Sequence, residues 1–87
     1  MAPRARRIGK SVHSPEHEAF RSLMVEARDK TGLTQQKLAK RLGKHQSFVA
    51  KYERGERRLD VVEFLWIARA IGADPVRILR ALMRRQS

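Results

Sequence analysis

Two short helical patterns separated by a glycine constrain the fold of this chain more than any other feature. Thr34 offers a capping hydroxyl to the first helix, and Leu38 and Leu42 give that helix one apolar face. Gly43 ends the helix, because glycine adopts the left-handed conformation at low cost. A second short helix is expected over residues 46–53, with polar side chains facing outward. This pattern is typical of a helix-turn-helix, whose second helix reads DNA.

The same segment resembles the Cro/cI-type (XRE) helix-turn-helix family of regulators. Several spaced motifs match in the right order, and the match covers roughly residues 20–82. The resemblance implies an all-α fold, the compact five-helix, lambda-repressor-like DNA-binding domain with a helix-turn-helix. The matching residues are Arg28, Gly32, Leu33, Thr34, Gln35, Leu38, Ala39, Leu42, Gly43, Gln46, Ser47, Val49, Tyr52, Glu53, Gly55, Ile71 and Gly72.

Helical periodicity on both sides of this segment independently predicts five helices and no strands. Ser14, Asp60 and Asp74 each precede a proline or a nearby acid and mark helix starts. The expected helices cover about 15–30, 35–42, 46–53, 61–71 and 75–83. A chain of 87 residues forms one domain. We place the domain at 14–84, between a flexible basic N-terminal tail (residues 1–13) and a frayed C-terminus (85–87).

The charge of the chain favours a polyanionic partner. Twenty Lys and Arg residues against nine Asp and Glu give a net charge of +11. Residues 34–58 hold eight basic and two acidic residues, so over half of this charge lies in under a third of the chain. DNA, RNA or an anionic membrane surface would attract such a protein, and the alternative is a solvated basic surface.

Missing residue types exclude several classes of function. The chain has no cysteine, which excludes disulfides and thiolate metal sites and fits a reducing compartment. His13 and His17 lie far from His45, and no acidic residue lies at ligand spacing from His45, so a metal site is not expected and we expect no cofactor. No apolar run approaches the ~20 residues of a membrane span. We therefore expect a cytoplasmic protein that is not an enzyme and has no membrane partner.

The second helix of the motif carries side chains suited to base edges. Glutamine pairs with adenine through two hydrogen bonds and lysine reaches guanine, so Gln46, Ser47 and Lys51 are candidate base-reading residues. Alternatively, some of them contact only phosphate or water. Phe48 departs from the family, which commonly has a small polar residue there. It could pack under the helix or meet a thymine methyl, and we favour packing.

Candidate phosphate contacts surround that helix. Gln35 opens the first helix of the motif, where free N–H groups attract a phosphate, and the resemblance implies that this glutamine grips the DNA backbone. His45 occupies the cap position where the family prefers serine or threonine, and it could donate to a phosphate instead. The full set of candidates is Gln35, Lys44, His45, Arg54, Arg57 and Arg58. The tail over residues 1–13 could also contact DNA, or could be a disordered end.

The resemblance also implies an ion pair between Arg28 and Glu53, buried between two helices. Its role would be to orient the second helix of the motif. The alternative is two unconnected surface charges. Removing one partner of a buried pair is costly, whereas the pair itself is weak evidence for stability.

A second apolar stripe on the helix expected over 61–71 invites a partner. Val62, Leu65 and Trp66 form this stripe, and tryptophan is enriched at interface centres. Relatives usually dimerise through their C-terminal helices, so we expect a homodimer that binds half-sites about one helical turn apart. Alternatively, Trp66 packs within the chain, under the last helix or under the basic tail. In the last helix, Leu79 is expected to be buried.

Two functions from different classes fit these features. The first is a sequence-specific transcriptional regulator, a homodimeric repressor that binds a double-stranded DNA operator. The second is an antitoxin-like protein-interaction module on the same fold, with secondary DNA binding. Its surface would be the second stripe together with a row of arginines on the last helix. A protein antagonist or partner is therefore a further candidate ligand.

Overall fold

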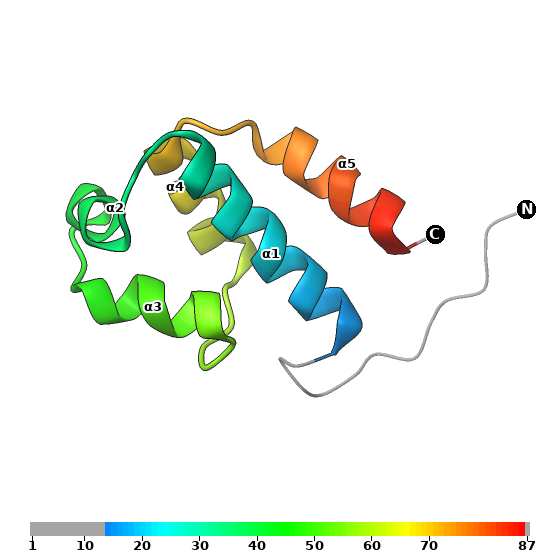
Figure 1. The fold of residues 1–87 in the computed structure, drawn as a ribbon, viewed down its shortest axis with the longest axis horizontal. Helices are drawn as coiled ribbons and strands as arrows, with labels where there is room; N and C mark the ends of the chain where they lie inside the picture. Colours follow the sequence, from blue (N-terminus) through cyan, green and yellow to red (C-terminus); the bar gives the residue numbers. More distant parts are fainter. Residues whose placement is uncertain (1–13, 87) are drawn as a thin grey trace, which may run out of the picture.

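Five α-helices make up the part of the chain that the structure, a computed structural model, describes: residues 14–86 (Figure 1). They are α1 (Pro15–Lys30), α2 (Gln35–Leu42), α3 (Gln46–Arg54), α4 (Val61–Ile71) and α5 (Pro75–Gln86). No strand occurs among these residues. The expectation of an all-α, five-helix fold is confirmed. The tail expected over residues 1–13 lies outside the described residues.

Local sequence signals set most helix ends. Ser14 Oγ accepts a hydrogen bond from the His17 N–H at 3.2 Å and begins α1, and Thr34 caps α2 in the same way. The carboxylate of Asp60 accepts from the Glu63 N–H at 2.7 Å, while Glu63 accepts from the Asp60 N–H at 3.0 Å. This reciprocal capping box fixes the start of α4.

α5 extends to Gln86, past its expected end near Met83. The last turn has a partner on α1, because Arg85 Nη2 donates to the Glu26 carboxylate at 3.0 Å. These two residues are far apart in sequence, so helical periodicity alone could not indicate this contact. α3 likewise ends one residue later than expected, at Arg54.

The core joins all five helices around α1 and α4. α1 packs against α3 and α5, α2 packs against α3 and α4, and α4 packs against α5. Phe20 of α1 meets Phe64 of α4 edge to face, with ring centroids 5.5 Å apart. Figure 1 shows α3 on one side of α1 and α5 on the other. The buried side chains are Leu23, Met24, Leu33, Leu38, Ala39, Val49, Tyr52, Phe64, Ile67, Ala68, Ile71 and Ile78.

Leu79 is not buried, contrary to expectation, and is 43% exposed. α5 contacts the domain through the face that carries Ile78 and Leu82, and Leu79 is turned about 100° from Ile78 around the helix. Val76 and Met83 are also exposed and lie on the same outer face as Leu79, at spacings of three and four residues. The outer face of α5 is therefore apolar as well as basic.

Candidate nucleic-acid interface

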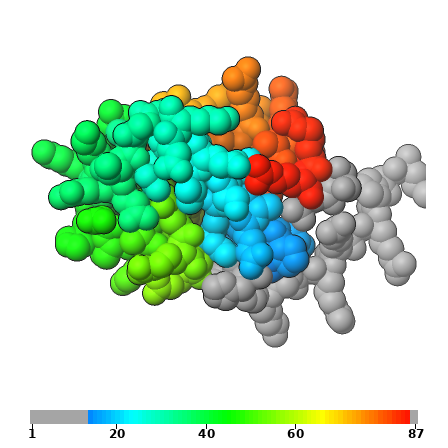
Figure 2. All heavy atoms as spheres, in the orientation of Figure 1, coloured from blue at the N-terminus to red at the C-terminus, as the bar shows by residue number. Residues whose placement is uncertain are grey.

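The outer face of α3 presents the three candidate base-reading residues to solvent. Val49 and Tyr52 point into the core and hold the helix against the domain. Gln46, Ser47 and Lys51 are all exposed. Figure 2 shows α2 and α3, in green, forming one end of the molecule. These polar side chains are thus accessible to a DNA groove, on a helix whose inner side is firmly packed.

The turn before α3 is short, and hydrogen bonds satisfy its backbone N–H groups at Lys44 and Ser47. Gly43 has φ +67° and ends α2, and the Lys44 N–H donates to the Ala39 carbonyl at 2.9 Å. His45 then caps α3, because its Nδ1 accepts from the Ser47 N–H at 3.1 Å. A ring nitrogen therefore replaces the hydroxyl that the family prefers at this cap.

Arg28 and Glu53 meet across the α1–α3 contact. Arg28 donates to the Glu53 carboxylate from Nε at 2.8 Å and from Nη2 at 3.1 Å, and Arg28 Nη1 donates to the Leu33 carbonyl at 2.8 Å. The side chains of Arg28 and Glu53 are only 12% and 5% exposed. The hydrogen bonds to Glu53 raise the pKa of Arg28 despite its partial burial. This geometry ties the last turn of α3 to α1.

Gln35, at the start of α2, contacts the same carboxylate and does not project freely. Its Nε2 donates to Glu53 Oε1 at 2.8 Å. Arg28, Gln35 and Glu53 together form the Glu53 cluster. Glu53 thus binds side chains from both α1 and α2. The bond spans 18 residues, and no local pattern in the sequence indicates it. A phosphate contact by Gln35 stays a prediction, and it would start from a side chain already oriented by α3.

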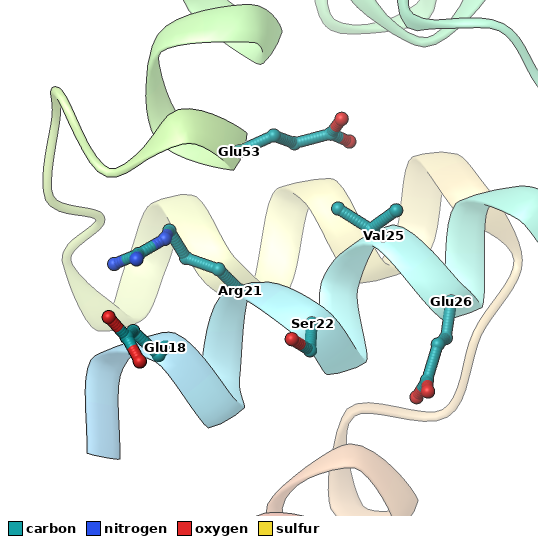
Figure 3. Close-up of a pocket in the computed structure, with 6 residues that line it drawn as sticks. All are labelled: Glu18, Arg21, Ser22, Val25, Glu26 and Glu53. Atoms are coloured by element: carbon teal, nitrogen blue, oxygen red, sulfur yellow. The ribbon is translucent and has the colours of Figure 1, made fainter. Parts of the chain in front are cut away.

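A shallow pocket of about 520 Å³ lies beside this cluster, between α1 and the end of α3 (Figure 3). Three carboxylates line it, those of Glu18, Glu26 and Glu53, so it is unsuited to a phosphate. Arg21 projects from α1 toward the end of α3. A Cβ added to Gly55, which has φ +82°, would lie 2.8 Å from Arg21 Cζ. This close approach was not anticipated from the sequence.

Arg57, a candidate phosphate contact, is held within the protein. Its guanidinium lies over the Phe48 ring, with Cζ 4.7 Å from the centroid. It also donates to the Glu63 carboxylate at 2.7 and 3.2 Å. These hydrogen bonds raise the pKa of Arg57 and lower that of Glu63. A phosphate would have to compete with both partners.

Phe48 packs, as favoured from its size. Its ring meets Tyr52 edge to face, with centroids 5.8 Å apart, and contacts the core. Lys44 Nζ lies 5.8 Å from the same ring. The Phe48 ring of α3 therefore contacts one cation that precedes the helix in sequence, Lys44, and one that follows it, Arg57.

The remaining candidate phosphate contacts are exposed around α3. They are Lys44, His45, Arg54 and Arg58. Arg54 Nε donates to the Glu56 carboxylate, but both side chains are more than half exposed, and such surface pairs contribute little. A phosphate could therefore replace Glu56 as the partner of Arg54 at little cost in free energy.

The expected apolar stripe of α4 is partly exposed. Val62 and Trp66 are 51% and 56% exposed, whereas Leu65 is half-buried and packs against the core. Val61, at the start of α4, is exposed too. Among the described residues, Trp66 borders a hollow with Arg41 and Leu42 of α2 and remains more than half exposed. The exposed apolar side chains of α4 therefore include Val61 in addition to Val62 and Trp66.

Other kinds of site find no support in the described part of the chain. Among residues 14–86, no group of three or more His, Asp or Glu side chains is placed to hold a metal ion. Within the same range, no helix is long and apolar enough to cross a membrane.

Comparison with known proteins agrees with this geometry. The helix-turn-helix family matches residues 24–78. An XRE-family like protein from Pseudomonas syringae pv. tomato is 46% identical, with a TM-score of 0.81 over 87% of this chain and 93% of the other. The restriction-modification controller protein C.AhdI from Aeromonas hydrophila is 32% identical, with a TM-score of 0.63 over 80% of this chain and 99% of the other.

A more distant structure shares the fold alone. The clp gene regulator ClgR from C. glutamicum is 19% identical, with a TM-score of 0.74 over 86% of this chain and 97% of the other. A search of curated proteins returned no match. The helix-turn-helix geometry, the family match and the 46% identical structure together show that this chain belongs to the XRE helix-turn-helix family of non-enzymatic, DNA-binding transcriptional regulators.

Proposed function

We propose that this chain is a homodimeric repressor that binds a double-stranded DNA operator with α3 in the major groove. The observation that carries the proposal is the exposed first turn of α3. Gln46 and Ser47 project there from a helix whose opposite face is fixed in the core, next to exposed cations. This arrangement supports base reading by the helix and phosphate contacts on both sides of it.

The rigidity of α3 supports sequence reading rather than charge attraction alone. The Glu53 cluster ties the end of the helix to α1 and α2, and Phe48 braces its start against Arg57. A helix that is fixed at both ends holds its side chains in one position relative to the rest of the domain. Base-edge hydrogen bonds depend on such positioning, whereas attraction between cations and phosphates does not.

A second copy of the chain would cover the exposed apolar side chains of α4 and α5. Val62 and Trp66 on α4, and Leu79 and Met83 on α5, are each more than 40% exposed. Exposed apolar groups on neighbouring helices favour an interface, and a two-fold axis would present two α3 helices to two half-sites. The similarity to a restriction-modification controller protein supports the regulatory role.

Substitutions in α3 test DNA reading. Gln46→Ala should relax sequence preference by about 1–3 kcal/mol at one base pair. Arg54→Ala should weaken binding to all sequences alike and reduce the salt slope by about 1. Gln36→Ala, an exposed glutamine on α2, is the matched control and should keep the preference. Operator affinity equal to wild type in both Gln46→Ala and Arg54→Ala would refute α3 as the reading helix.

Sedimentation of the purified protein tests the dimer. The wild-type protein should sediment as a dimer, and Trp66→Ser should sediment as a folded monomer with weaker operator binding. Lys30→Ser, on the exposed end of α1, should leave the dimer intact. A wild-type monomer would refute the homodimer. Release of a different, co-purifying protein by Trp66→Ala would instead favour the antitoxin-like function.

A further inference from the structure

The residue that caps α3 also contacts the hydroxyl of a candidate base-reading residue. His45 Nδ1 lies 3.1 Å from the backbone nitrogen of Ser47 and 3.0 Å from Ser47 Oγ. One ring nitrogen thus contacts both polar groups of the same serine. The roles of donor and acceptor in these two contacts can be assigned from the chemistry of the groups.

The backbone N–H decides the assignment. An amide N–H can only donate, so Nδ1 must be the acceptor and carry no hydrogen. The neutral imidazole then has its hydrogen on Nε2. Because Nδ1 has no hydrogen to give, the 3.0 Å contact is a hydrogen bond only when the Ser47 hydroxyl donates, sharing the Nδ1 lone pair with the backbone N–H. The lone pairs of Oγ remain for a ligand.

We infer that His45 makes Ser47 a hydrogen-bond acceptor, so that Ser47 selects an exocyclic amino group of adenine or cytosine on the strand it contacts. The inference rests on the proposed function, because it takes α3 as the reading helix. Serine alone tolerates either partner, since its hydroxyl rotates. With the hydroxyl hydrogen directed to His45, the keto oxygens of guanine and thymine meet a lone pair and are disfavoured.

His45 acts here as a positioning residue. Both His45 and Ser47 are exposed in the free protein, so water satisfies either orientation of the hydroxyl there. In a DNA groove that excludes water, a mismatched acceptor would lose its partner. One neutral hydrogen bond contributes about 0.5–1.5 kcal/mol, so the expected discrimination is about fivefold.

The experiment begins by finding the base that Ser47 contacts. Random duplexes are selected with wild-type protein and with Ser47→Ala, and the contacted position is the one whose preference changes. Adenine or cytosine should be preferred there by the wild-type protein. Replacing that base with purine or 2-pyrimidinone, which lack the amino group, should weaken wild-type binding about fivefold. The same base replacement should not weaken operator binding by Ser47→Ala.

Two His45 variants test the positioning role. His45→Asn keeps an oxygen that can accept from both Ser47 groups, and it should keep the preference for the amino group. His45→Ala removes the acceptor, and its ratio of affinities for amino-bearing and keto-bearing operators should approach one. Because this readout is a ratio, any phosphate binding by His45 itself affects both operators equally and cancels. Circular dichroism checks that both variants are folded.

The possible failures are distinguishable. A wild-type preference for guanine or thymine, no changed position in Ser47→Ala, or an unchanged ratio in folded His45→Ala would overturn the inference. In that case Gln46→Ala would still relax the preference, and the proposed function would stand. If neither Gln46→Ala nor Ser47→Ala changed any preference, the proposed function would fail together with the inference.

Discussion

Removing Arg28 should destabilise this domain more than removing any arginine of its exposed ion pairs. In Arg28→Met, the Glu53 carboxylate keeps only the hydrogen bond from Gln35, and the Leu33 carbonyl loses its donor. The Glu53 side chain is 5% exposed, so water cannot replace the guanidinium without a rearrangement of α1 and α3. The variant therefore leaves a buried charge largely uncompensated.

The expected loss is a large share of the total stability. Breaking a buried ion pair by removing one partner costs about 3–5 kcal/mol. A chain of 87 residues has a total stability of about 4–13 kcal/mol, at about 0.05–0.15 kcal/mol per residue. The double variant Arg28→Met, Glu53→Leu should recover most of the loss, because an apolar pair of similar volume is often as stable as a buried ion pair.

Urea unfolding followed by circular dichroism measures this loss. With an m-value of about 1–3 kcal/mol/M, the Arg28→Met midpoint should fall by at least about 1 M. Arg85→Met is the matched control: it breaks the exposed pair with Glu26, and such pairs contribute about 0–1 kcal/mol. A midpoint shift no larger for Arg28→Met than for Arg85→Met would refute the reasoning. So would a double variant as unstable as Arg28→Met alone.

Three further predictions concern the loop after α3. Gly55→Ala should lower the free energy of unfolding by about 1–2 kcal/mol, because alanine is strained at φ +82°. The same loss in an Arg21→Ala background would show that backbone strain causes the loss, and not the contact with the Arg21 guanidinium. Glu63 has a lowered pKa through its bonds to Arg57 and the Asp60 N–H, so its contribution to stability is complete above its usual pKa of 4.5 and is lost as the pH falls through the lowered value. Acid unfolding of Glu63→Gln should lack that contribution, and an acid profile identical to wild type would contradict it. Arg57→Ala should change the salt slope of operator binding less than Arg54→Ala does in anisotropy titrations, because Arg57 is held by Phe48 and Glu63; equal changes would restore Arg57 as a phosphate contact.

The sequence predicted those features that depend on neighbouring residues. α1 and α2 begin and end as expected, because Ser14, Thr34 and Gly43 act on backbone groups within a few residues. The inward faces of α3 and α4 also followed from spacing alone, with Val49 and Ile67 in the core. Helical periodicity and caps are local, and a single sequence contains them in full.

Features that join distant parts of the chain could not be predicted in the same way. The bond from Gln35 to Glu53 and the pair of Arg85 with Glu26 depend on how helices pack. The sequence wrongly places Leu79 in the core, because the apolar pattern of α5 is wider than the face that the domain covers. The use of His45 Nδ1 as the cap depends on a side-chain rotation that residue type does not reveal.

Arg57 shows why the contacts of a site residue could not be predicted from the sequence. Its charge and its place after α3 predicted a phosphate contact, as they did for Arg54. Only the folded loop brings its guanidinium over Phe48 and against Glu63. Charge in the sequence therefore identified the basic surface as a whole, while only the three-dimensional arrangement shows that Arg57 is held by partners within the protein.

The central claim is that two copies of this chain read DNA specifically through α3. Selection from a pool of random duplexes at physiological salt, with sequencing of the retained fraction, tests it most directly. We predict a two-fold symmetric motif with half-sites about 10 bp apart or a near multiple of that spacing. Retention without any enriched motif, with affinity falling steeply as salt rises, would indicate phosphate attraction alone and would contradict the claim.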